Sequence, residues 1–127
     1  TQIYSLKEVF GMLNNYLTDW EAVENIDLIK KTALQVWGEN IEFGEIKGSN
    51  SPYPEFEWQI YLYSKFSIKL DYDRSTLSIG VPTKEGYVVL SSLTNESVFW
   101  GFDGMKPENL LHNFQVLDRL IQTQKID

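Results

Sequence analysis

The sequence predicts an α+β fold in which two N-terminal helices precede a mostly antiparallel meander sheet of five to six strands. A C-terminal helix is expected to pack on one face of that sheet. Apolar residues recur at helical spacing as far as Trp37 and again after Pro107, whereas between these points they alternate as in strands. Helices and strands that occupy separate parts of a chain indicate the α+β class. The 127 residues contain no repeat or linker, so residues 1–127 are expected to form a single domain.

The first predicted helix begins at Ser5, because Ser5 and Glu8 have the spacing of a capping box. Tyr4 and Val9 have the spacing of the hydrophobic staple that accompanies such a box. The apolar side of this helix consists of Leu6, Val9, Phe10, Leu13, Tyr16 and Leu17.

The second predicted helix spans about residues 20–37. Thr18 and Glu21 form another capping box, and Gly38 is suited to end a helix. The alternative is a split near Asp27, which would then cap a shorter helix. The buried stripe is predicted to be Ala22, Ile26, Ile29, Ala33 and Val36.

After Gly38 the apolar period changes from 3.6 to 2. A strand is expected to open at Ile41, and Gly44 is expected to mark a bulge before Ile46. Residues 48–54 contain two prolines and small polar residues, which predict a loop.

Residues 55–73 read EFEWQIYLYSKFSIKLDYD, and Ser64 is the one even-numbered position that is not apolar. Nineteen extended residues would span about 60 Å at roughly 3.3 Å each, which exceeds a domain with a radius of gyration of about 14 Å. A hairpin with its loop at residues 63–65 keeps the apolar residues on one face. It pairs Leu62 with Phe66, Ile60 with Ile68, and Trp58 with Leu70. A single bent or bulged strand is the alternative.

A turn at Arg74 leads to a strand over residues 77–81, followed by strands over residues 87–93 and 98–102. Trp58 and Trp100 are expected at inward-facing strand positions. The last helix is predicted from Pro107 to about Thr123, with proline favoured at its first position. Its apolar face is predicted to be Leu110, Leu111, Phe114, Leu117, Leu120 and Ile121. Its solvent side is predicted to be Asn109, Asn113, Asp118, Arg119 and Gln122.

The formal net charge is −7, and nearly all of the excess lies in one third of the chain. Residues 19–57 contain nine carboxylates and three lysines. This segment would repel nucleic-acid backbones and anionic membranes and would attract a basic protein, although solubility alone also accounts for an acidic chain. No apolar run reaches the roughly 18 residues of a membrane helix, and no signal-peptide pattern is present, so a cytoplasmic location is expected.

The sequence carries no catalytic signature. It has no cysteine and a single histidine, His112, which argues against a zinc site and a thiol nucleophile. Asp71 and Asp73 resemble the start of a calcium loop, but the glycine and the distal glutamate are missing. Glu55 and Glu57 lie about 7 Å apart on one strand face, a spacing that solubility explains as well as catalysis. We therefore expect no enzyme activity, no cofactor and no metal.

Carboxylates and tyrosines on the solvent side of the strands predict a protein-binding surface, because tyrosine offers a large rigid contact area and a hydroxyl group. The residues predicted to bind a partner are Glu39, Glu42, Glu45, Tyr53, Glu55, Glu57, Tyr61 and Tyr63.

The function predicted from these features is that of a non-catalytic protein-binding module with a basic protein as its partner. In its most concrete form it is a bacterial immunity-type protein that neutralises a basic, nuclease-like toxin. One alternative is a dimeric binder similar to a secretion chaperone. Another is a carrier that holds a small apolar ligand between the sheet and a helix.

Overall fold

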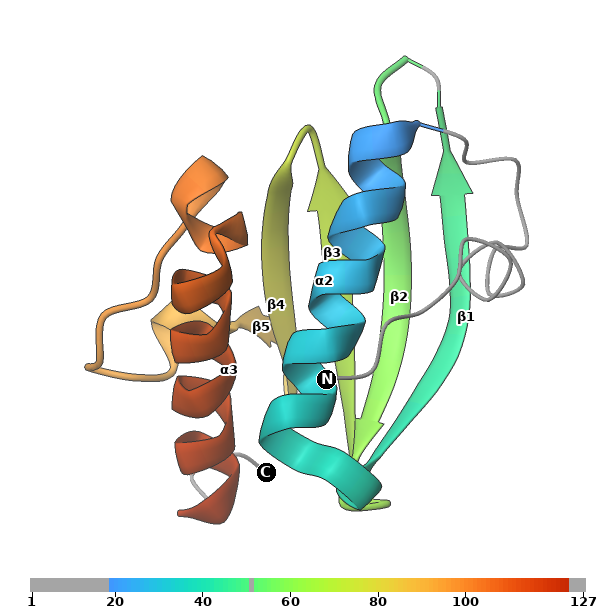
Figure 1. Cartoon of the computed structure of the whole chain (residues 1–127). Helices are drawn as coiled ribbons and strands as arrows, with labels where there is room; N and C mark the ends of the chain where they lie inside the picture. Colours follow the sequence, from blue (N-terminus) through green and yellow to red (C-terminus); the bar gives the residue numbers. More distant parts are fainter. Residues whose placement is uncertain (1–18, 51, 124–127) are drawn as a thin grey trace.

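The computed structural model describes residues 19–50 and 52–123, which form two layers. Helices α2 (Trp20–Trp37) and α3 (Pro107–Gln122) cover one face of a five-stranded antiparallel sheet (Figure 1). The strands follow one another in the order β1-β2-β3-β4-β5. Their bounds are Ile41–Ser49, Glu55–Leu62, Phe66–Asp73, Thr76–Thr83 and Gly86–Val89. The α+β class, the antiparallel meander and the C-terminal helix are thereby confirmed.

One helix, α2, precedes the sheet in the described part of the chain, whereas two were predicted. The helix expected from Ser5 lies outside the described residues, as does Thr18, one half of the second predicted capping box. Asp19 caps α2, since its Oδ2 accepts a hydrogen bond of 3.0 Å from the backbone N–H of Ala22. The helix continues unbroken past Asp27, which pairs with Lys31 at 2.7 Å.

The hairpin predicted within residues 55–73 is confirmed, with the predicted register. Leu62 pairs with Phe66, and the pairs continue to Glu55 opposite Asp73. The turn adopts the left-handed conformation without a glycine, because Tyr63 has a φ of 56° and Ser64 a φ of 54°. This backbone conformation is unfavourable for residues that carry a side chain.

The bulge predicted at Gly44 is also confirmed, because the register of β1 against β2 shifts between Phe43 and Ile46. The bulge turns the carbonyl of Gly44 toward the core, where the indole N–H of Trp58 donates to it at 2.9 Å. Trp58 is therefore fully buried with its polar group satisfied.

The strand predicted over residues 98–102 is absent, and β5 ends at Val89 instead of residue 93. Leu90–Ser92 and Gly101–Met105 form 3₁₀ turns in this connection. The side chain of Asn113 supplies the hydrogen bonds that a neighbouring strand would have given to Phe99. Trp100, predicted to face inward, is 83% exposed.

Asn113 was predicted on the solvent side of α3, but its side chain is buried. The buried apolar residues of α2, α3 and the inner sheet face form one core. Trp37 and Phe114 meet at 5.2 Å between ring centroids and connect the two helices. No helix in residues 19–50 or 52–123 is long and apolar enough to cross a membrane.

Candidate functional site

The outer face of the sheet, away from the helices, gathers most of the residues predicted to bind a partner. Glu55, Glu57 and Tyr61 lie at alternate positions of β2 and are exposed. Glu42 is exposed on β1 directly opposite Tyr61. Glu45, at the bulge, shares with Glu57 and Tyr61 a hollow of about 270 Å³.

Two of the predicted residues lie at opposite ends of this region. Glu39 is exposed in the turn Gly38–Asn40, where α2 leads into β1 (Figure 1). Tyr53 lies at the other end, in the loop between β1 and β2, and is 51% exposed. The guanidinium carbon of Arg74 lies 4.8 Å from the centroid of the Tyr53 ring, so a cation already covers one face of that ring.

Tyr63 does not belong to this surface, which corrects the prediction. Its hydroxyl donates to Oδ1 of Asp118 at 2.6 Å and accepts a hydrogen bond from Gln122 at 2.8 Å. Tyr63 lies in the turn, where the left-handed backbone interrupts the alternation of the strand and directs the ring toward α3. Burial, followed by the contact with Asp118, raises the pKa of the Tyr63 hydroxyl.

Strand β3 adds two exposed carboxylates that the predicted set omitted. Asp71 lies directly opposite Glu57, and Asp73 lies directly opposite Glu55. These four carboxylates line a hollow of about 420 Å³. We call the following residues the acidic face: Glu42, Glu45, Glu55, Glu57, Asp71, Asp73 and Tyr61.

Three basic side chains lie among the carboxylates of the acidic face, and one of them, Arg74, pairs with Asp73 at 3.3 Å. Lys47 of β1 lies opposite Glu57 on the side away from Asp71. The ammonium of Lys69 lies 3.9 Å from the carboxylate of Glu57, at the limit of an ion pair. Partial burial raises the pKa of the Asp71 carboxyl, and the charge of Glu57 raises it further, although Lys69 acts in the opposite direction. At Asp71 the attraction of Lys69 outweighs the repulsion from Glu57, so burial is the cause that raises the pKa. The face as a whole stays negative, because it has six carboxylates against Lys47, Lys69 and Arg74.

Toward β5 the outer face carries neutral side chains that form hydrogen bonds with one another. The amide of Gln59 donates to the hydroxyls of Ser67 at 2.6 Å and Tyr87 at 2.7 Å. The Tyr87 ring lies across Gly80, just as the Tyr61 ring lies across Gly44 on the other side. Tyr87 is 46% exposed and was missing from the predicted surface. Tyr87 lies three strands after Gln59 along the chain, so the sequence gave no local signal for this contact.

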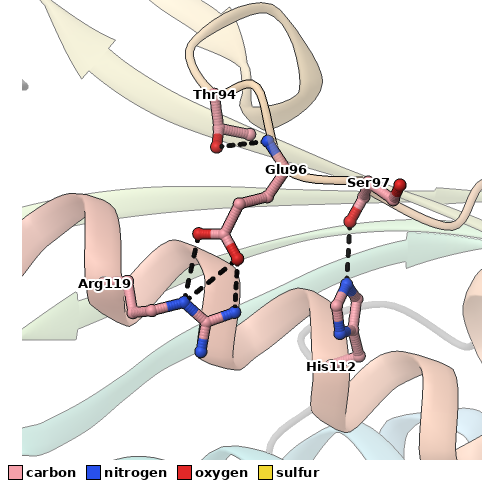
Figure 2. Close-up of polar contacts among 5 residues, drawn as sticks. All are labelled: Thr94, Glu96, Ser97, His112 and Arg119. Atoms are coloured by element: carbon pink, nitrogen blue, oxygen red, sulfur yellow. Dashed lines mark hydrogen bonds and ion pairs between the residues drawn. The ribbon is translucent and has the colours of Figure 1, made fainter.

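The connection between β5 and α3 is fixed to α3 by polar contacts (Figure 2). Arg119 donates to both carboxylate oxygens of Glu96, at 2.7 Å for the shortest bond, and this contact lowers the pKa of the Glu96 carboxyl. Nε2 of His112 lies 2.8 Å from the backbone oxygen of Ser97. His112, the only histidine of the sequence, is half-buried and makes a structural contact.

Within residues 19–50 and 52–123, no group of three or more His, Asp or Glu residues is arranged to hold a metal ion. Comparisons of the chain with protein-family models, with curated proteins and with solved structures gave no match.

Proposed function

We propose that this chain is a non-catalytic module that binds a basic protein through its acidic face. In the most concrete form of the proposal, it is a cytoplasmic immunity protein that neutralises a basic, nuclease-like bacterial toxin. The supporting observation is the register of β2 and β3, which places Glu57 opposite Asp71 and Glu55 opposite Asp73.

Two successive pairs of like charges on neighbouring strands lower the stability of a sheet, because directly opposite side chains lie close together. Solubility requires negative charge, but it does not require carboxylates to face one another. A cationic side chain placed between Glu57 and Asp71 would remove the repulsion. The relief of that repulsion would then contribute favourably to the free energy of binding.

The aromatic residues of the face also fit this proposal. Tyr61 is 42% exposed, and its ring is held in place against Gly44. A side chain that is already ordered loses little entropy on binding. Its ring can contact the aliphatic or guanidinium part of an arginine, while Glu42 and Glu57 neutralise the charge.

The packing of the core favours a surface over an internal ligand site. Trp58 and Ile60 from the sheet and Phe114 from α3 are fully buried between the layers. These three large side chains fill the space between the layers around them. The outer face, with its hollows and charges, is the better candidate for binding.

The proposal is tested by capturing partners from the source cell with the wild-type protein and measuring the association of the main partner by stopped flow. We expect a partner with an isoelectric point above about 9, whose association rate falls steeply between low and physiological salt. The double variant Glu57→Lys/Asp71→Lys should slow association by about 100-fold.

The matched control is Glu24→Lys/Glu85→Lys, which changes the net charge equally. Glu24 is exposed on α2 and Glu85 lies in the turn between β4 and β5, so neither belongs to the acidic face. If both double variants lost the same factor in association rate, net charge alone would explain the effect, and this result would contradict the proposed site. Partners that are not basic would contradict the function.

A further inference from the structure

Three aromatic side chains on the connection between β5 and α3 are exposed although they are apolar. Phe99, Trp100 and Phe102 have exposed fractions of 38%, 83% and 74%. We call these three residues the aromatic patch. Since an aromatic side chain offers about 150–250 Å², the patch presents about 400 Å² of apolar surface, within the range in which such patches are often functional.

The chain that carries the patch is fixed at Phe99 before any partner arrives. The amide of Asn113 donates to the backbone oxygen of Phe99, and its oxygen accepts from the backbone N–H of Phe99, both at 2.9 Å. The edge of the Phe99 ring contacts the ring of His112, with 5.4 Å between centroids. Gly101, at a φ of 64°, allows the sharp turn between Trp100 and Phe102. The ordering entropy that binding costs is therefore reduced at Phe99.

The charges around the patch indicate which partner fits it. Asp103 pairs with Lys106 at 3.0 Å, and Glu96 pairs with Arg119 at 2.7 Å. Glu108 is also exposed nearby, in the first turn of α3, where the helix dipole favours it. The surroundings are therefore nearly neutral in a chain of net charge −7. Two copies of this acidic chain therefore meet little charge repulsion at this patch.

We propose that the aromatic patch is the contact surface of a weak, twofold-symmetric dimer of this chain. A twofold axis brings each patch against its own copy, so that the rings stack on one another. Asp103 of one copy then faces Lys106 of the other, because opposite charges lie side by side at the border of the patch. Stacking and charge are both self-complementary, which an isologous contact requires.

The area of the patch sets the expected strength of the dimer. About 400 Å² per copy is roughly half of what a stable specific interface buries on each side. The dimer should therefore form only at high concentration, with a Kd on the order of 100 µM. The acidic face lies on the outer side of the sheet and the patch on the connection that leads into α3, so the dimer is independent of the proposed function (Figure 1).

Sedimentation velocity of the full chain between about 10 µM and 1 mM tests the proposal, together with NMR spectra of the indole N–H groups over the same concentrations. We expect the mean mass to rise from 14.8 kDa toward twice that value. The Trp100 indole signal should shift with concentration, and that of Trp20, which is 56% exposed elsewhere, should not. Trp100→Ser/Phe102→Ser should remain monomeric, whereas Trp20→Ser should dimerise as the wild type does.

Exchanging the charges of Asp103 and Lys106 tests whether the partner of the patch is a second copy of the chain. Asp103→Lys and Lys106→Asp alone should each weaken the dimer by about threefold to tenfold, and the double exchange should restore it. A wild-type monomer at 1 mM, or equal shifts of Trp100 and Trp20, would overturn the proposal. So would binding of the wild-type chain to neutral phosphatidylcholine vesicles that is lost in Trp100→Ser/Phe102→Ser, since a bilayer would then be the partner of the patch.

Discussion

Replacing Asn113 with alanine should destabilise the protein and release the connection between β5 and α3. The substitution removes both hydrogen bonds to the backbone of Phe99. At about 1 kcal/mol each, these bonds contribute roughly 2 kcal/mol. Alanine recovers about 0.6 kcal/mol through its higher helix propensity, and the small cavity left by the amide opposes that gain. The net loss should be about 1.5–2.5 kcal/mol in the free energy of unfolding.

Urea unfolding of Asn113→Ala measures this loss, and amide hydrogen exchange at Phe99 shows whether the connection has been released. The control is Gln115→Ala, on the exposed side of the same helix, which should change stability by less than about 0.5 kcal/mol. If Asn113→Ala changes stability by as little as the control and the Phe99 amide still exchanges slowly, then the side chain does not hold the connection.

The substitution Asn113→Asp tests the two hydrogen bonds individually, because it keeps one of them and removes the other. The carboxylate keeps an acceptor for the N–H of Phe99 but places a second acceptor against its carbonyl, so the loss at neutral pH should exceed that of alanine. In acid the protonated carboxyl again has a donor for that carbonyl. Because the folded state favours the protonated form and so raises the pKa of this carboxyl, stability should recover as the pH falls through the raised pKa and be fully recovered below about 4. A loss that does not change with pH would contradict this arrangement.

Three further predictions concern the hairpin of β2 and β3. Ser64→Gly should raise the free energy of unfolding by about 1 kcal/mol by relieving the φ of 54°, whereas Ser91→Gly should lower it slightly. The raised pKa of Tyr63 gives stability that is present below pH 10 and is lost as the pH rises through the folded-state pKa, so Tyr63→Phe should flatten that alkaline loss in urea titrations. Asp71→Asn should stabilise the protein by a few tenths of a kcal/mol at pH 7 and not at pH 3, since the pKa of Asp71 is raised; a stability gain at both pH values would exclude charge repulsion as its cause.

The hairpin could be predicted from the sequence because a single physical requirement determines it. A strand with one buried face must keep its apolar residues in step with those of its neighbour, and one register achieves this around Ser64. The bulge at Gly44 was predictable for a related reason, since a glycine interrupts the alternation in β1 there.

The connection after β5 could not be predicted in the same way. Val98, Trp100 and Phe102 alternate as strand residues do, but the partner of their backbone is a side chain of α3 and not another strand. The available signal was Asn113, which lies next to the core residue Phe114. A periodicity argument assigns an asparagine to the solvent side of a helix, so it misses one that is buried to bind backbone groups.

Tyr63 shows the same limit at the candidate site. The odd-numbered residues of β2 do face outward, but Tyr63 follows the end of the strand, and its backbone has a positive φ. Conversely, Asp71 and Asp73 follow the strand pattern, and their alignment with Glu57 and Glu55 follows from the predicted register. The charges of the site were thus more predictable than its aromatic residues.

The register also explains why the repulsion on the acidic face persists. Trp58 pairs with Leu70 and Ile60 pairs with Ile68 on the inner face, and all four are fully buried. Slipping β3 by one residue would separate Glu57 from Asp71, but it would turn those apolar residues to the solvent at about 1.5–3 kcal/mol each. Like-charge repulsion of at most about 1 kcal/mol per pair cannot drive that change. The core therefore keeps Glu57 opposite Asp71 whatever their charges, so removing the charge of Asp71 should strengthen the fold while it weakens the binding of a basic partner.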